Sequence, residues 1–207
     1  MEIKYAQTAK EARYWVDRGH ESVECSFGQD SVVGPLVLDH HGKLSKEPAV
    51  SLKAVRLALA GVRIEKFVVT GFADTDAAYA IGVLAGFIPP VMTQAEAVAD
   101  LDIDPVRDQT AERYRKALLH QKAVLSSPLS EEGFRQSVAE AIRIFNGRYT
   151  PGEEEKALRE ERGRREDAKK AILAKSEDGK ALLVSFGDWG QDVWFQESPV
   201  VVRLDEA

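Results

Sequence analysis

The sequence predicts an α/β protein with a mainly parallel central sheet, flanking helices, a helical middle section and a carboxyl-terminal antiparallel strand group. Apolar runs that end in polar loops alternate with helical patterns over residues 1–90, which is typical of a parallel sheet. After Pro89-Pro90 the patterns become helical. Residues 180–207 contain short apolar runs separated by turn residues, as expected of short strands.

Four strands are predicted in the amino-terminal part, at Ile3–Ala6, Ser22–Phe27, Val32–Leu38 and Lys66–Thr70. Ser22–Phe27 alternates apolar and polar residues, the pattern of a half-buried strand, and the last two runs are apolar enough for buried strands. Helices are predicted from Thr8 to Gly19, from Ser51 to Gly61 and over Ala77–Gly86. Thr8 opens the first through a capping box, and Ser51 is the predicted N-cap of the second.

In the second half, helices are predicted to begin at Asp104 with Pro105, at Ser130 and, through a capping box, at Thr150. The segment Glu153–Asp178 carries nine acids and eight bases, and this near balance indicates a solvated helix or a mobile linker. Short strands are predicted at Ala181–Phe186, Val193–Gln196 and Val200–Leu204. The predicted organisation is therefore an α/β domain at 1–148, a charged segment at 149–179 and a β segment at 180–207 that either completes the main sheet or forms a small cap.

Composition narrows the class of protein. The net charge of −6 argues against a broad surface for duplex nucleic acid. The amino terminus lacks the pattern of a secretory signal, and the longest apolar stretch, Ala77–Ile88, is too short to span a bilayer. We therefore expect a cytoplasmic protein with no membrane contact. Cys25, the single cysteine, excludes an intrachain disulfide and is expected to be buried.

Two polar loops follow predicted buried strands: Asp39-His40-His41-Gly42, and Ala73-Asp74-Thr75-Asp76-Ala77. Because the carboxyl ends of parallel strands share one edge of a sheet, the two loops are expected to form one site. Carboxylates and imidazoles are ligands for divalent ions such as Mn²⁺ and Mg²⁺, which hydrolyse phosphate esters. The alternative is structural, since carboxylates also cap helices.

At these residues the sequence resembles the DHH phosphoesterase family, over about residues 30–90. The resemblance implies one or two Mn²⁺ or Mg²⁺ ions bound by His40, Asp74 and Asp76, with Asp39 supporting or joining the cluster. It also implies that His41 contacts the substrate phosphate and takes part in catalysis with His40. The implied substrate is a phosphate-containing small molecule or a short oligonucleotide.

The chain also departs from that family. The aspartate-rich loop follows the Asp-His-His motif instead of preceding it, and Thr70 or Gly71 stands where the family has a histidine ligand. His20 is a candidate replacement, although its place at a helix end favours a capping contact. The competing hypothesis is a catalytically degenerate module of the same fold that binds a nucleotide or a protein. The sequence indicates neither the substrate nor the oligomeric state.

Overall fold

The computed structural model describes residues 1–28, 30–71, 73–103, 129–185, 198 and 200–204. Its central sheet has the order β1-β5-β2, with bounds β1 Glu2–Tyr5, β5 Lys66–Val69 and β2 Glu21–Val23. Both β1 and β2 pair with β5 in parallel. The predicted α/β class with a parallel sheet is therefore confirmed.

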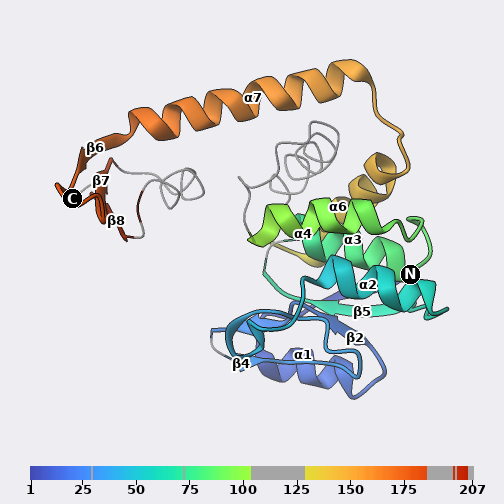
Figure 1. Cartoon of the computed structure of the whole chain (residues 1–207). Helices are drawn as coiled ribbons and strands as arrows, with labels where there is room; N and C mark the ends of the chain where they lie inside the picture. Colours follow the sequence, from blue (N-terminus) through green and yellow to red (C-terminus); the bar gives the residue numbers. More distant parts are fainter. Residues whose placement is uncertain (29, 72, 104–128, 186–197, 199, 205–207) are drawn as a thin grey trace.

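Helices cover both faces of this sheet (Figure 1). Helix α1 (Ala9–Val16) packs on one face, where its Ala12 joins a cluster with Val68. The other face, through Phe67 and Val69, belongs to the main core with the helices listed next. These are α2 (Val50–Leu59), α3 (Thr75–Leu84), α4 (Met92–Ile103) and α6 (Glu131–Phe145). The alternation along β5 follows from the period of two in a strand.

The predicted strand at Val32–Leu38 is wrong. The segment has no regular secondary structure, and we call it the strap. Only Leu38 pairs with the central sheet, through an isolated parallel bridge to Val23. Pro35 lies in its middle and has no N–H group to donate to a ladder. Instead, the Gly34 N–H donates to the Ser22 hydroxyl, 2.7 Å away, and the Leu36 N–H donates to Glu21, 3.2 Å away.

The predicted strand Ser22–Phe27 is divided in two. After β2 the chain turns at Glu24, a non-glycine residue with a φ of 50°. It then forms β3 (Ser26–Phe27), which pairs antiparallel with β4 (Asp30–Ser31). The short 3₁₀ helix η1 (Gly42–Leu44) follows the Asp-His-His motif. The turn at Glu24 sets the β3–β4 hairpin apart from the central sheet.

Two predicted helix starts are displaced. The N-cap of α2 is Ala49 and not Ser51, which lies inside the helix. Helix α3 begins at Thr75 with Asp74 as its N-cap, two residues before the predicted start. In both cases an aspartate of the Asp74–Asp76 loop supplies the capping oxygen.

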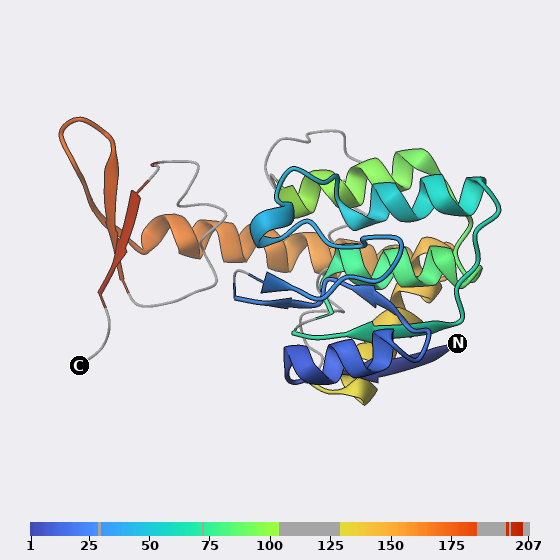
Figure 2. The same cartoon turned by 90° about the horizontal axis from the view of Figure 1, so that it is seen from below.

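The carboxyl-terminal part consists of α7 (Pro151–Lys170), β6 (Ile172–Lys175), β7 (Ala181–Val184) and β8 (Val200–Arg203). Helix α7 leads from the α6 end of the main body to the small sheet at its far end (Figure 2). The sheet is mixed, because β7 pairs antiparallel with β6 but parallel with β8, which corrects the antiparallel expectation.

Strand β6 was not predicted, because it lies in the charged segment at 149–179. The predicted helix start at Asp104 and the predicted strand at Val193–Gln196 lie outside the described residues. Within the described part of the chain, no helix is long and apolar enough to cross a bilayer.

Candidate metal site

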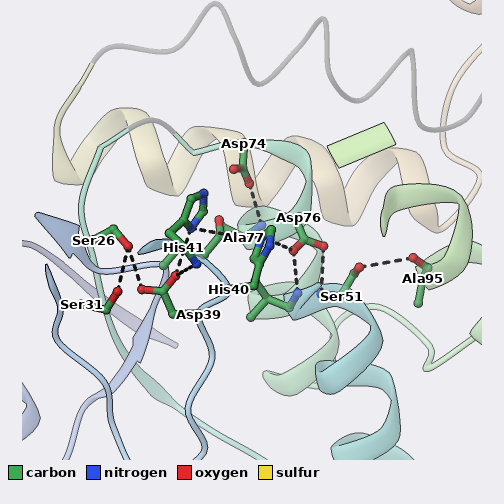
Figure 3. Close-up of polar contacts among 12 residues, drawn as sticks. Ser26, Ser31, Asp39, His40, His41, Ser51, Asp74, Asp76, Ala77 and Ala95 are labelled. Atoms are coloured by element: carbon green, nitrogen blue, oxygen red, sulfur yellow. Dashed lines mark hydrogen bonds and ion pairs between the residues drawn. The ribbon is translucent and has the colours of Figure 1, made fainter. Parts of the chain in front are cut away.

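The candidate site lies at the carboxyl edge of the central sheet. Glu24 follows the last residue of β2, and Asp39 follows Leu38, which is bridged to β2. Asp74 and Asp76 come after β5, at the start of α3. The paired strands of the central sheet run in parallel, so the loops after them emerge on the same side. The two predicted loops do lie together, as Figure 3 shows.

Glu24, His40 and His41 form the tightest group of potential ligands. Their ligand atoms all lie within 4.8 Å of one another, the one such group among the described residues. The Glu24 Oε1 atom is 3.0 Å from Nε2 of His40 and 3.9 Å from Nδ1 of His41. Glu24 and His40 are largely buried, whereas the side chain of His41 is 46% exposed. The group therefore combines two imidazoles and a carboxylate, with His41 on the solvent side.

Asp39 supports His41. Its Oδ1 accepts hydrogen bonds from the His41 N–H, 2.9 Å away, and from the ring Nδ1, 3.0 Å away, and its Oδ2 accepts one from the Ser26 hydroxyl. Burial alone would raise the pKa of Asp39, but the hydrogen bonds from His41, Ser31 and Ser26 outweigh it and lower the pKa to about 2. The same contact with Asp39 raises the pKa of His41. Asp39 therefore holds the His41 imidazole in place.

Asp74 and Asp76 both cap helices (Figure 3). Oδ1 of Asp74 accepts the Ala77 N–H of its own helix, 2.8 Å away. The fully buried Asp76 instead caps α2: its Oδ2 accepts the Val50 N–H at 2.6 Å and its Oδ1 accepts the Ser51 N–H at 2.9 Å. The capping alternative is therefore right about their hydrogen bonds. Asp76 also lies 3.7 Å from Nε2 of His40, so it links the two loops.

Two residues with strained backbone conformations belong to the site region, and one of them is the potential ligand Glu24. Glu24 and Val37 are the non-glycine residues with positive φ in the described part of the chain, at 50° and 52°. The left-handed region costs an L-residue roughly 1–2 kcal/mol, most of all a β-branched one such as Val37. The Lys53 ammonium on α2 donates to the Val37 carbonyl, 2.7 Å away, and pairs with Glu47. Strain of this kind persists where the surroundings impose it, and it is often found at functional sites.

Sequence reasoning missed Glu24. Its position in an alternating segment placed it on the polar face of a half-buried strand, whereas it is a buried turn residue. The nearest sequence signal is that an acid follows the apolar Val23 at the end of a strand. His20 does not replace the missing histidine: its Nδ1 contacts the Trp15 carbonyl and its Nε2 lies 3.4 Å from Glu2, at the amino end of β1. Cys25 is buried as expected, and its thiol donates a hydrogen bond to the Val68 carbonyl oxygen.

Comparison with protein-family models, with curated proteins and with solved structures finds no match to this chain. A function must therefore be argued from the residues and the geometry of the site.

Proposed function

We propose that this protein is a divalent-metal-dependent phosphoesterase that hydrolyses a phosphoester or phosphoanhydride in a small molecule, nucleotide or short oligonucleotide. One observation carries the proposal. The Asp39-His40-His41 loop and the start of α3 meet at the carboxyl edge of a parallel sheet, where His40 lies 3.0 Å from Glu24 and 3.7 Å from Asp76. Open α/β sheets bind their ligands at this edge. The resemblance to DHH phosphoesterases supports the same chemistry.

Glu24, His40 and His41 are the residues that would hold the ion, since imidazole nitrogens and carboxylate oxygens are suitable donors for a divalent cation. A bound ion supplies an activated water nucleophile and stabilises charge on the phosphoryl oxygens. Asp39 keeps the His41 ring in place. His41 is on the solvent side, so a phosphate could reach an ion held there. With Nδ1 on Asp39 and the other ring nitrogen on the ion, His41 would be a metal ligand and not the phosphate contact that the resemblance implies.

This ligand set differs from the one implied by the resemblance, in which Asp39, Asp74 and Asp76 approach the metal. Each of these carboxylates accepts N–H hydrogen bonds within the protein. The same observation favours the second candidate function, a degenerate module that binds a nucleotide or a protein without hydrolysis. The two candidates differ in whether the site turns over a phosphate ester.

The test is a hydrolysis screen of the full chain with Mn²⁺, Mg²⁺ or Zn²⁺. Suitable substrates are bis-p-nitrophenyl phosphate, pyrophosphate, short oligonucleotides and cyclic dinucleotides. We expect turnover of at least one substrate, lowered about 10²–10³-fold or more in His40→Ala. The matched control is Asp30→Asn, which alters an exposed carboxylate on the neighbouring hairpin. Absence of turnover with every ion would reject the phosphoesterase and favour the binding module. Equal turnover in His40→Ala would reject this group of residues as the active site.

A further inference from the structure

The chemistry of the ligand group bears on which ion the site takes. Two imidazoles and one carboxylate form one of the ligand sets of catalytic zinc sites, which keep a further position for water or substrate. Mg²⁺ prefers oxygen ligands, whereas imidazole suits Zn²⁺ and related transition ions. The group of Glu24, His40 and His41 offers one oxygen ligand and two nitrogen ligands. This composition therefore favours Zn²⁺ or a related transition-metal ion, which we call a zinc-class ion, over Mg²⁺.

The contacts of the other carboxylates bear on how many ions bind. A second ion close to the first would need Asp39, Asp74 or Asp76 as a bridging or additional ligand. Both oxygens of Asp76 accept backbone N–H groups of α2, and Oδ1 of Asp74 accepts that of Ala77. Asp39 directs Oδ1 to His41 and Oδ2 to Ser26. Drawing these oxygens toward an ion would weaken the start of two helices or release His41.

Asp39 also has the position of a supporting group. Metal-binding histidines usually contact a carboxylate through the other ring nitrogen, which fixes the ring and increases its basicity. Asp39 is 1% exposed and lies 3.0 Å from Nδ1 of His41, which leaves Nε2 of His41 as the ring nitrogen for the ion. The open side of the group is at His41, which is nearly half exposed. An ion there has one protected side and one side that solvent can reach.

We propose that Glu24, His40 and His41 form a mononuclear site for a zinc-class ion, with Asp39 as the residue that positions His41. The inference rests on the proposed function for its biological role, but the binding of the ion stands on the ligand group alone. It departs from the expectation of one or two Mn²⁺ or Mg²⁺ ions bound by His40, Asp74 and Asp76, with Asp39 supporting or joining them. Asp74 and Asp76 are then structural residues that place the ligands.

The experiment is a metal titration of the full chain after chelator treatment and dialysis. Zn²⁺ binding is followed by competition with a chromophoric chelator, and bound metal is counted by elemental analysis. We expect about one Zn²⁺ per chain, retained in roughly a hundredfold excess of Mg²⁺. Two ions per chain, no uptake of Zn²⁺, or displacement of Zn²⁺ by that excess of Mg²⁺ would overturn the proposal. These measurements use the wild-type chain, so they do not depend on the folding of a variant.

Variants then assign the ligands. Glu24→Gln and His40→Ala should abolish stoichiometric uptake, and Asp39→Asn should weaken Zn²⁺ binding about 10–100-fold. Asp30→Asn is the matched control and should bind normally. Uptake that survives in Glu24→Gln but is lost in a folded Asp76→Asn, judged by circular dichroism, would favour the aspartate ligand set and overturn the proposal.

The hydrolysis screen separates this proposal from the function. One bound Zn²⁺ without turnover of any phosphate ester would support the mononuclear site and contradict the phosphoesterase. Turnover that requires two Mn²⁺ or Mg²⁺ ions per chain would support the phosphoesterase and contradict the mononuclear site. The two proposals can therefore fail independently.

Discussion

Asp76 is a buried carboxylate whose hydrogen-bonding partners belong to another helix. The sequence predicted a carboxylate near the start of a helix in this loop, and the position of Asp76 in the first turn of α3 confirms it. Its partners, the N–H groups of Val50 and Ser51, lie about 25 residues away in the chain, so no local pattern can reveal them. The sequence therefore placed Asp76 at the correct edge of the sheet, but its contacts depend on tertiary packing.

Substitutions at the two aspartates should separate the two kinds of cap. Asp76→Asn replaces an acceptor oxygen by an NH₂ group that faces a backbone N–H, so a buried donor loses its partner at a cost of about 1–3 kcal/mol. Asp74→Asn is the matched control, and it should change stability by less than about 0.5 kcal/mol because asparagine is an equally good N-cap. Urea unfolding of both variants measures the difference. Equal stabilities would mean that Asp76 does not hold α2.

Helices and strands were predicted correctly where all the residues of a segment lie in similar surroundings. Strand β5 is a continuous apolar run, and α3 is a run of small apolar residues, so both were found to within a few residues. The strap at Val32–Leu38 is equally apolar, but in its middle the N–H groups of Gly34 and Leu36 donate to the side chains of Ser22 and Glu21 instead of to a neighbouring strand. Pro35 was the signal against a strand. Glu24 was missed for a related reason, since its left-handed turn interrupts an apparently regular alternation.

The contact between β2 and the strap should make stability depend on pH. Glu21 is buried against Gly34, where a Cβ atom would lie 2.5 Å from Oε1 of Glu21. Burial raises the pKa of Glu21 to about 7 from 4.5, although the hydrogen bond from Leu36 partly offsets the shift. The folded state thus favours the neutral acid. Its contribution to stability is complete below pH 4.5 and is lost as the pH rises through about 7.

Glu21→Gln should remove this dependence, because the amide stays neutral and its oxygen can still accept the Leu36 N–H. We expect the variant to be more stable than the wild type at pH 8, by as much as about 3 kcal/mol, and similar to it at pH 4. Denaturant unfolding across this pH range measures the effect. Glu65→Gln, at an exposed position just before β5, is the control and should follow the wild type. Parallel curves for Glu21→Gln and the wild type would show that Glu21 does not titrate as a buried acid.

In the whole molecule, the main apolar core lies before the start of α7, and a separate apolar cluster lies at the end of α7. The main core, with all the strands of the central sheet and helices α2, α3, α4 and α6, lies within residues 3–145. A separate cluster of Ala168, Ala171, Leu182 and Val184 joins the end of α7 to the small mixed sheet. Between them, Ala157 packs on Ile144, and Glu153 pairs with Arg143 at 3.0 Å. The candidate site draws all its residues from the first part, so it should not need the second.

A chain that ends at Tyr149 should therefore fold and keep the metal site. The truncation removes the Ala157 contact and one partly exposed ion pair, which we expect to cost about 1–2 kcal/mol, and each kcal/mol lowers the melting temperature by about 2–4 °C for a chain of this size. Circular dichroism, a thermal melt and the Zn²⁺ titration measure the outcome. The matched control is Leu182→Asp in the full chain, which disrupts the cluster at the end of α7 and should leave Zn²⁺ binding unchanged. A truncated chain that is unfolded, or a Leu182→Asp chain that no longer binds the ion, would mean that the carboxyl-terminal sheet is part of the same folding unit as the site.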